Sequence, residues 1–184
     1  MIAVCTPTRD TIQGSTTFDL VNLCRVSKEA IFTVSFGSLL SNVRLLLAKT
    51  AMDNKCSHVL FIDSDMRFPQ DSLKRLLSRR QDIIGANCKQ RTQDAWTARR
   101  KGEFVSSATK EGIEEVDILG FGVTLISAKV FHSLEQPWFG NPFDGTKLLG
   151  EDVYFCTKAK EAGYKIYADH DLSHEVKHIG AVEL

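Results

Sequence analysis

The chain has 184 residues, of which 43% are hydrophobic and 25% are charged. These fractions are typical of soluble globular domains and exclude a disordered, collagen-like or fibrous protein. The 23 Lys and Arg residues balance the 23 Asp and Glu residues, so the net charge of zero excludes a polycation built to bind phosphate backbones. The length is that of one domain.

No apolar run approaches the roughly 20 residues that cross a bilayer, so we expect no membrane span. Residues 1–5 lack the basic segment of a signal peptide and are predicted to form a first strand. The five cysteines are scattered and form no Cys-x-x-Cys pair, which indicates reduced thiols in a cytoplasmic protein. They are Cys5, Cys24, Cys56, Cys88 and Cys156.

In the first half of the chain, short β-rich runs alternate with helical patterns. The expected strands are residues 2–5, 31–35, 58–62 and 82–86. This alternation predicts a parallel, doubly wound sheet in one α/β domain.

The expected helices of this half lie between those strands. The predicted apolar face of the first helix consists of Phe18, Val21 and Cys24. Ser38 is the predicted N-cap of the second helix. The apolar face of that helix is formed by Leu40, Val43, Leu47 and Ala51. A third helix is expected at residues 72–80.

The predicted strands and helices of the second half do not alternate regularly. Its expected strands are residues 115–119, 121–127 and 164–168, and its expected helices are residues 128–134 and 151–162. Gly163 is placed to cap the second of these helices at its C-terminus. The segment 136–150 is expected to be a loop.

Two acids, Asp63 and Asp65, follow the apolar run 59–62. In an extended chain their side chains point the same way, about 7 Å apart. Ligands of open parallel sheets bind at this edge, and hard divalent cations choose oxygen ligands. The pattern therefore favours a metal site. The alternative is that Asp63 caps a turn and Asp65 is solvated.

Four motifs occur in a characteristic order. They are Thr6-Pro7-Thr8-Arg9, Asp63-Ser64-Asp65, Gly150-Glu151-Asp152 and Val176-Lys177-His178-Ile179-Gly180. In this order they resemble a GT-A glycosyltransferase, most nearly the compact family-2-like members of bacteria and phages. The resemblance implies a single Rossmann-like GT-A domain with a mostly parallel sheet and a minimal acceptor-binding part. It also implies a nucleotide-sugar-binding half at residues 1–90 and an acceptor and catalytic half at residues 91–184.

The resemblance further implies roles for particular residues. Asp63 would approach the nucleotide ribose, and the predicted metal set of Asp63, Asp65 and His178 would hold Mn²⁺ or Mg²⁺ against the diphosphate of the donor. From their positions along the chain, the following residues are expected to contact the nucleotide sugar: Thr6, Pro7, Thr8, Arg9, Arg44, Asp63, Ser64, Lys89 and Arg91. The segment after the first strand can equally be only a turn. Arg44 can reach the phosphate region or belong to a solvated helix face.

Glu151 and Asp152 lie in the first turn of a predicted helix, where the helix dipole favours carboxylates. That effect alone can explain them. Sugar transfer offers a second explanation, because an acceptor hydroxyl must lose its proton as it attacks. In inverting members of the family that this chain resembles, the acid that corresponds to Asp152 is the base. Some related folds retain configuration without such a base.

Two other readings remain open. His174-Glu175-Val176-Lys177-His178 matches the H-E-x-x-H pattern of zinc hydrolases, which requires a helix. The chain can also be a non-catalytic α/β module that binds nucleotides. The sequence contains neither a Walker-type loop nor a G-x-G-x-x-G motif. The phosphate-binding loops typical of kinases and of dinucleotide-binding enzymes are therefore missing, which argues against both classes.

The acceptor is the least defined part of the prediction. Residues 89–101 carry a local charge of +4 around Trp96, a pattern that can bind a nucleic-acid backbone or neutralise a diphosphate. The acceptor can thus be a glycan, a small molecule or a modified DNA base. Trp138 and Phe139 are placed either to stack on a sugar or to anchor their loop.

Overall fold

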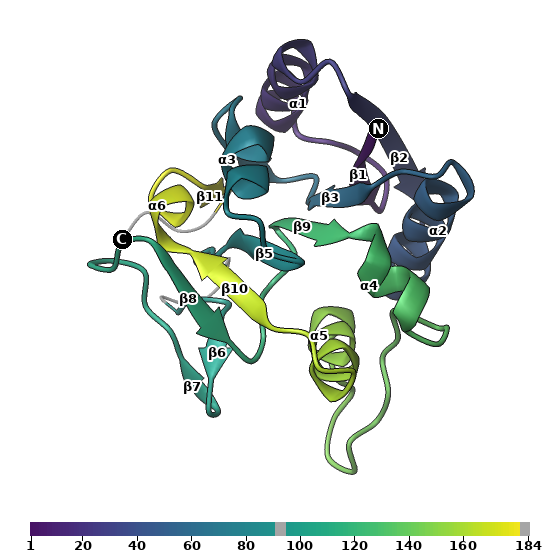
Figure 1. The fold of residues 1–184 in the computed structure, drawn as a ribbon, viewed down its shortest axis with the longest axis vertical. Coiled ribbons are helices and arrows are strands. Elements are labelled where there is room, and N and C mark those ends of the chain that lie inside the picture. Colours follow the sequence, from purple (N-terminus) through teal and green to yellow (C-terminus); the bar gives the residue numbers. More distant parts are fainter. Residues whose placement is uncertain (91–94, 181–184) are drawn as a thin grey trace.

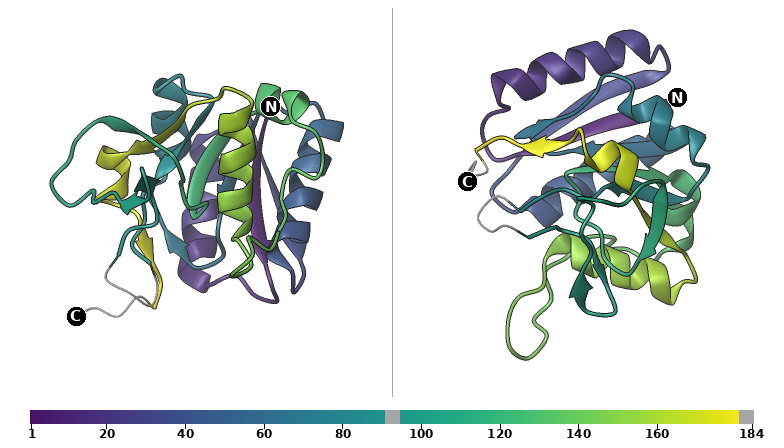
Figure 2. Two further views of the ribbon diagram at one scale, coloured as in Figure 1. Left: turned by 90° about the horizontal axis from the view of Figure 1, so that it is seen from below. Right: turned by 90° about the vertical axis from the view of Figure 1, so that its left-hand side faces the viewer.

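The structure, a computed structural model, describes residues 1–90 and 95–180. Its centre is a seven-stranded sheet with helices on both faces (Figures 1 and 2). The strands of this sheet are β1 (Ile2–Thr8), β2 (Ala30–Phe36), β3 (His58–Ile62), β5 (Ile83–Ala86), β8 (Ile113–Val116), β9 (Val123–Ser127) and β10 (Ile166–Asp169). Their spatial order is β2-β1-β3-β9-β5-β10-β8.

Five of these strands run in one direction and two run against them. Parallel pairing joins β1 to β2 and to β3, and β5 to β10, whereas β9 and β8 pair antiparallel with their neighbours. The mostly parallel sheet confirms the predicted Rossmann-like α/β domain. The insertion of β9 between β3 and β5 was not predicted, because residue periodicity identifies strands but not their neighbours.

Two hydrophobic clusters fill the space between the sheet and its helices. One lies under α1 (Gly14–Val26), α3 (Ser72–Ser78) and α6 (His170–Ser173), and the other under α2 (Leu40–Asp53), α4 (Ala128–Ser133) and α5 (Glu151–Glu161). The inner strand β3 contributes to both clusters, since side chains alternate across a sheet. Its four apolar residues are therefore buried on both faces, as is typical of a parallel sheet.

The predicted apolar face of α1 is wrong. Phe18 and Val21 are 64% and 60% exposed, whereas Asp19, Leu20 and Leu23 are buried. Asp19 accepts hydrogen bonds from the Arg67 guanidinium and from the backbone N–H of Phe68. These bonds offset the cost of burying the Asp19 carboxylate, so the helix turns that side toward the sheet.

The helix ends confirm one prediction and contradict another. The N-cap of α2 is Leu39 rather than Ser38, and no side-chain hydrogen bond caps this end. Val43, Leu47 and Ala51 are buried as predicted, whereas Leu40, the fourth member of the predicted apolar face, is exposed. Gly163 follows α5 with a φ of +87°, a left-handed conformation that favours glycine at a helix C-terminus.

A group of aromatic rings packs between β3 and the helices α4 and α5. Phe139 lies 5.1 Å from Phe155 and 5.6 Å from Phe61, centroid to centroid. Trp138 packs on Phe131 and donates its ring N–H to the carbonyl of Leu134. Trp138 and Phe139 are therefore core residues that anchor their loop, so of the two predicted alternatives the structure supports anchoring and not stacking on a sugar.

Two short ribbons lie outside the main sheet. One pairs β6 (Arg99–Arg100) with β7 (Glu103–Phe104), and the other pairs β4 (Met66–Arg67) with β11 (Lys177–His178). The second ribbon brings a segment from the end of the described chain next to the residues that follow β3 (Figure 1). All five cysteines are unpaired. No helix within the described ranges is both long and apolar enough to cross a membrane.

Candidate functional site

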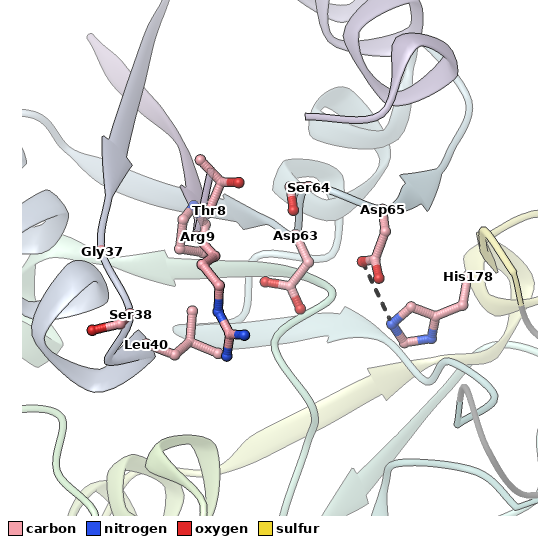
Figure 3. A pocket seen from close by; sticks show the side chains of 10 residues that line it. Thr8, Arg9, Gly37, Ser38, Leu40, Asp63, Ser64, Asp65 and His178 are labelled. Carbon is pink, nitrogen blue, oxygen red and sulfur yellow. Dashed lines mark ion pairs between the residues drawn. The ribbon is translucent and has the colours of Figure 1, made fainter. Parts of the chain in front are cut away.

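A pocket of about 260 Å³ lies at the carboxyl ends of β1, β2 and β3. In Figure 3 the carboxylates of Asp63 and Asp65 and the imidazole of His178 are seen at this pocket. This is the sheet edge at which ligands of open α/β folds bind. Its lining consists of Pro7, Thr8, Arg9, Gly37, Ser38, Leu40, Asp63, Ser64, Asp65 and His178.

The backbone of residues 63–65 is held by three distant segments. The N–H of Asp63 donates to the carbonyl of Gly122, and the carbonyl of Ser64 accepts from Gln13. The carbonyl of Asp65 accepts from Ile179 at 2.7 Å. Strand β3 ends at Ile62, so a turn rather than the strand alternation directs the two carboxylates. These bonds hold the backbone from which the two carboxylates project.

His178 is oriented toward Asp65 by a second contact of its ring. Its Nδ1 lies 2.7 Å from the carbonyl oxygen of Lys89, and a carbonyl can only accept, so Nδ1 carries the proton. In the neutral imidazole Nε2 then carries the lone pair, and it lies 4.0 Å from Oδ1 of Asp65 (Figure 3). A backbone carbonyl that fixes the tautomer in this way is common behind metal-binding histidines.

The separation of Asp65 and His178 fits a shared cation. Ligand atoms about 2.1 Å from an Mg²⁺ lie roughly 3 Å apart when adjacent and roughly 4 Å apart when opposite. In residues 1–90 and 95–180, no three His, Cys, Asp or Glu side chains group closely enough to hold a metal by themselves. Asp65 and His178 could therefore supply two ligands, and a bound molecule would have to supply others.

Asp63 faces a buried arginine. Nη2 of Arg44 lies 2.6 Å from Oδ1 of Asp63, and Nε of Arg44 lies 3.1 Å from Oε1 of Glu151. The guanidinium also lies over the rings of Phe61 and Phe121, at 5.2 and 5.5 Å. Burial raises the pKa of the Asp63 carboxyl, and the charge of Arg44 opposes that shift.

Arg44 thereby joins the two acidic motifs that the sequence separates by almost ninety residues. Its side chain is only 2% exposed and does not line the pocket. The expected contact with a donor phosphate is therefore replaced by contacts with Asp63 and Glu151. Its Nη1 atom is buried and has no hydrogen-bond partner among the described residues.

Asp152 lies one residue beyond Glu151 at the start of α5. One of its carboxylate oxygens accepts from the N–H of Val153 at 2.8 Å. Burial raises the pKa of the Asp152 carboxyl, and the negative charge of Glu151 raises it further. A raised pKa makes a carboxylate a better proton acceptor near neutral pH.

Gly150 leaves room for the Asp152 carboxylate. A Cβ at position 150 would lie 2.5 Å from Oδ1 of Asp152, although the φ of Gly150, −64°, suits any residue. We expect Gly150→Ala to displace this carboxylate while changing the melting temperature little. If Asp152 acts on a substrate, turnover should fall by roughly 10- to 100-fold, since small misplacements are costly in catalysis. Gly14→Ala, at the start of α1, with open space around it and without a left-handed φ, serves as the control for a glycine-to-alanine substitution.

The other residues that were predicted to contact the nucleotide sugar do not all lie at the pocket. Thr6 is buried, its hydroxyl has no partner among the described residues, and it does not line the pocket. Lys89 contributes its carbonyl to His178, while its ammonium lies 5.8 Å from the Trp96 ring. Arg91 falls outside the described residues. Arg100 pairs with Glu114, so part of the basic segment 89–101 is neutralised locally.

Three lining residues were not predicted. Gly37 and Ser38 belong to the connection from β2 to α2, and Leu40 is the first residue of α2. They could have been found, because β2 is parallel to β1 and its carboxyl end reaches the same edge.

The H-E-x-x-H pattern does not form the helix that a zinc hydrolase requires. Helix α6 ends at Ser173, and His178 lies in the strand β11. Nε2 of His174 contacts the carbonyl of Ser107 at 2.7 Å, and Glu175 pairs with Arg75. The two histidines therefore have separate partners and do not face one metal from a helix, so the structure does not support a zinc hydrolase.

No protein-family model matches this chain, and no curated protein matches it. A197 from STIV is similar in structure, with a TM-score of 0.64 and 16% identity over 91% of this chain and 80% of A197. The inositol-1-phosphate CTP transferase from T. maritima reaches a TM-score of 0.48 and 15% identity over 98% of this chain and 70% of that protein. The first likeness supports the fold, and neither bears on activity.

Proposed function

We propose that this chain is a metal-dependent glycosyltransferase, which moves a sugar from a nucleotide-diphosphate donor to an acceptor hydroxyl. The observation that carries the proposal is the approach of His178 to Asp65 at the carboxyl edge of the sheet, with the imidazole lone pair directed by Lys89. Carboxylate and imidazole together suit a divalent cation, and that cation needs further oxygen ligands.

The donor would lie in the pocket at the ends of β1 and β2. Pro7, Thr8 and Arg9 on one side and Gly37 and Ser38 on the other would contact the nucleoside. Its diphosphate would then reach Asp65 and His178, which would hold Mn²⁺ or Mg²⁺. When bound, the cation supplies positive charge that offsets the charge of the leaving diphosphate.

Asp152 is the proposed base. It would accept the proton of the acceptor hydroxyl as the new bond between that oxygen and the anomeric carbon forms. The bond from the anomeric carbon to the diphosphate breaks, and the nucleoside diphosphate leaves. Arg44 links the two ends of this arrangement, because it contacts both Asp63 beside the pocket and Glu151 beside the base.

Donor and metal binding are therefore expected to be coupled. Asp65→Ala should weaken the binding of Mn²⁺ and of the nucleotide sugar together, each by at least roughly 100-fold, since even residues behind a metal ligand contribute 10- to 100-fold to affinity. Titration calorimetry of a panel of nucleotide sugars, with Mn²⁺ and with a chelator, measures both effects.

Asp53→Ala is the matched control, because Asp53 is an exposed carboxylate at the far end of α2. It should bind donor and metal as the wild type does. Unchanged donor affinity in Asp65→Ala with Mn²⁺ present would remove Asp65 from the site. Donor binding with no turnover toward any acceptor or water would instead favour a nucleotide-binding module.

A further inference from the structure

One end of the sheet exposes an unusual amount of apolar surface. Thirteen large hydrophobic side chains of the described residues are exposed, and nine of them lie between residues 18 and 46. We call these nine the edge patch, and they belong to α1, β2 and the segment leading into and along α2. They are Phe18, Val21, Val26, Ile31, Phe32, Phe36, Leu39, Leu40 and Leu46.

Strand β2 at the centre of this patch is an open edge. In the described chain it has one hydrogen-bonded neighbour, β1, and it ends the strand order of the sheet (Figure 1). Edge strands of monomeric proteins are usually protected by charged side chains, prolines or short length. The seven residues Ala30–Phe36 contain neither a charge nor a proline. Such a strand is suited to pair with another strand.

The amount of apolar surface is that of a subunit interface. The nine side chains are each between 37% and 64% exposed, so at roughly 150 Å² per large apolar residue they present on the order of 700 Å². A standard interface buries about 800 Å² on each partner. The segment 18–46 carries three basic and two acidic residues, so it lacks the excess of basic charge that attracts anionic lipids.

We propose that two copies of this chain associate through β2, about a two-fold axis that passes through Thr33. The two strands would run antiparallel and join the sheets into one of fourteen strands. In this register Phe32 faces Val34 of the second copy, and Ala30 faces Phe36 of the second copy. Aromatic and β-branched residues are favourable cross-strand partners, and the small Ala30 leaves room for the ring of Phe36.

The other face of the strand pair is also self-complementary. Thr33 faces Thr33 of the second copy, and threonine pairs are favourable across strands. On the same side, Ser35, Leu39 and Leu46 border a hollow of about 260 Å³, which can receive side chains of the second copy. The remaining apolar residues of α1 would pack across the axis, because the two-fold rotation keeps equivalent helices on the same face.

The first test is the state of association in solution. Sedimentation velocity should show a dimer for the wild type and a monomer for Phe32→Lys, because a two-fold interface places each introduced charge near its copy. Phe104→Lys changes an equally exposed phenylalanine outside the patch, and it should remain a dimer. Circular dichroism verifies that both variants are folded.

The second test shows which residues of the two β2 strands lie opposite each other. In a Cys24→Ser background, Thr33→Cys should form a disulfide-linked dimer on mild oxidation, since opposed residues of antiparallel strands lie 4.5–5.5 Å apart, within the range of disulfides. Ser35→Cys is the matched control, because its two copies would lie at least about 13 Å apart.

Several outcomes would overturn the proposal. A wild-type monomer at high protein concentration, or a dimer that survives Phe32→Lys without cross-linking at position 33, would exclude this interface. A monomer that binds phospholipid vesicles and loses that binding in Phe32→Lys would assign the edge patch to a membrane surface instead. These measurements need neither donor nor metal, so they are independent of the proposed sugar transfer.

Discussion

Replacing Arg44 by methionine should lower the free energy of unfolding by about 3 kcal/mol, the lower end of the cost of removing one partner from a buried ion pair. The guanidinium contacts Asp63 and Glu151, whose side chains are 25% and 13% exposed. Without it two carboxylates remain near each other in a largely buried place, with little water to solvate them. Urea denaturation of wild type and variant measures the difference.

The loss should come from uncompensated charge rather than from lost packing. Adding Asp63→Asn and Glu151→Gln to Arg44→Met should therefore restore much of the stability, although donor binding should be weakened, because Asp63 lines the pocket. Arg75→Met is the matched control, since Arg75 pairs with the half-exposed Glu175 and should change stability by at most about 1 kcal/mol. If the triple variant lost as much free energy of unfolding as Arg44→Met does, Arg44 would stabilise the fold through its packing on the aromatic rings.

Asp152→Asn should reduce sugar transfer by roughly 10²- to 10⁴-fold, the usual contribution of a general base, while donor binding survives. The asparagine keeps the shape of the side chain, and its carbonyl oxygen can still accept from the N–H of Val153. Burial raises the pKa of the Asp152 carboxyl, so a neutral amide fits the same place. The melting temperature should therefore change little. Steady-state kinetics with the true acceptor, or slow hydrolysis of the donor, measures the effect.

Glu161→Gln removes an exposed carboxylate from the other end of the same helix and should leave transfer unchanged. A role of Asp152 in capping the helix would give a different pattern, with a lowered melting temperature and nearly normal turnover of the folded protein. Normal turnover in a folded Asp152→Asn variant would mean that the base lies elsewhere or that the reaction retains configuration without one.

Local sequence features predicted the seven strands of the main sheet, their approximate limits and the class of fold. The apolar run before Asp63 predicted a strand buried on both faces, because no polar residue interrupts it, and β3 is buried in this way. Gly163 predicted the end of α5, because the left-handed turn there requires a residue without a Cβ. The placement of Asp63, Asp65 and the segment Thr6–Arg9 at one edge followed from the parallel alternation of strands and helices, although β1 continues to Thr8 and so includes most of that segment.

The tertiary structure alone decided which side chains meet. Periodicity assigned the wrong face to α1, because the hydrogen bonds of Asp19 to a segment almost fifty residues away outweigh the exposure of Phe18. Arg44 was expected near a phosphate, yet its buried guanidinium forms ion pairs with two acids from distant segments. The meeting of His178 and Asp65 depends on the β4–β11 ribbon, a pairing between strands of two residues that no local pattern reveals. Local sequence sets the preferences of each segment, whereas charges that must be paired once they leave water set the way the segments fit together.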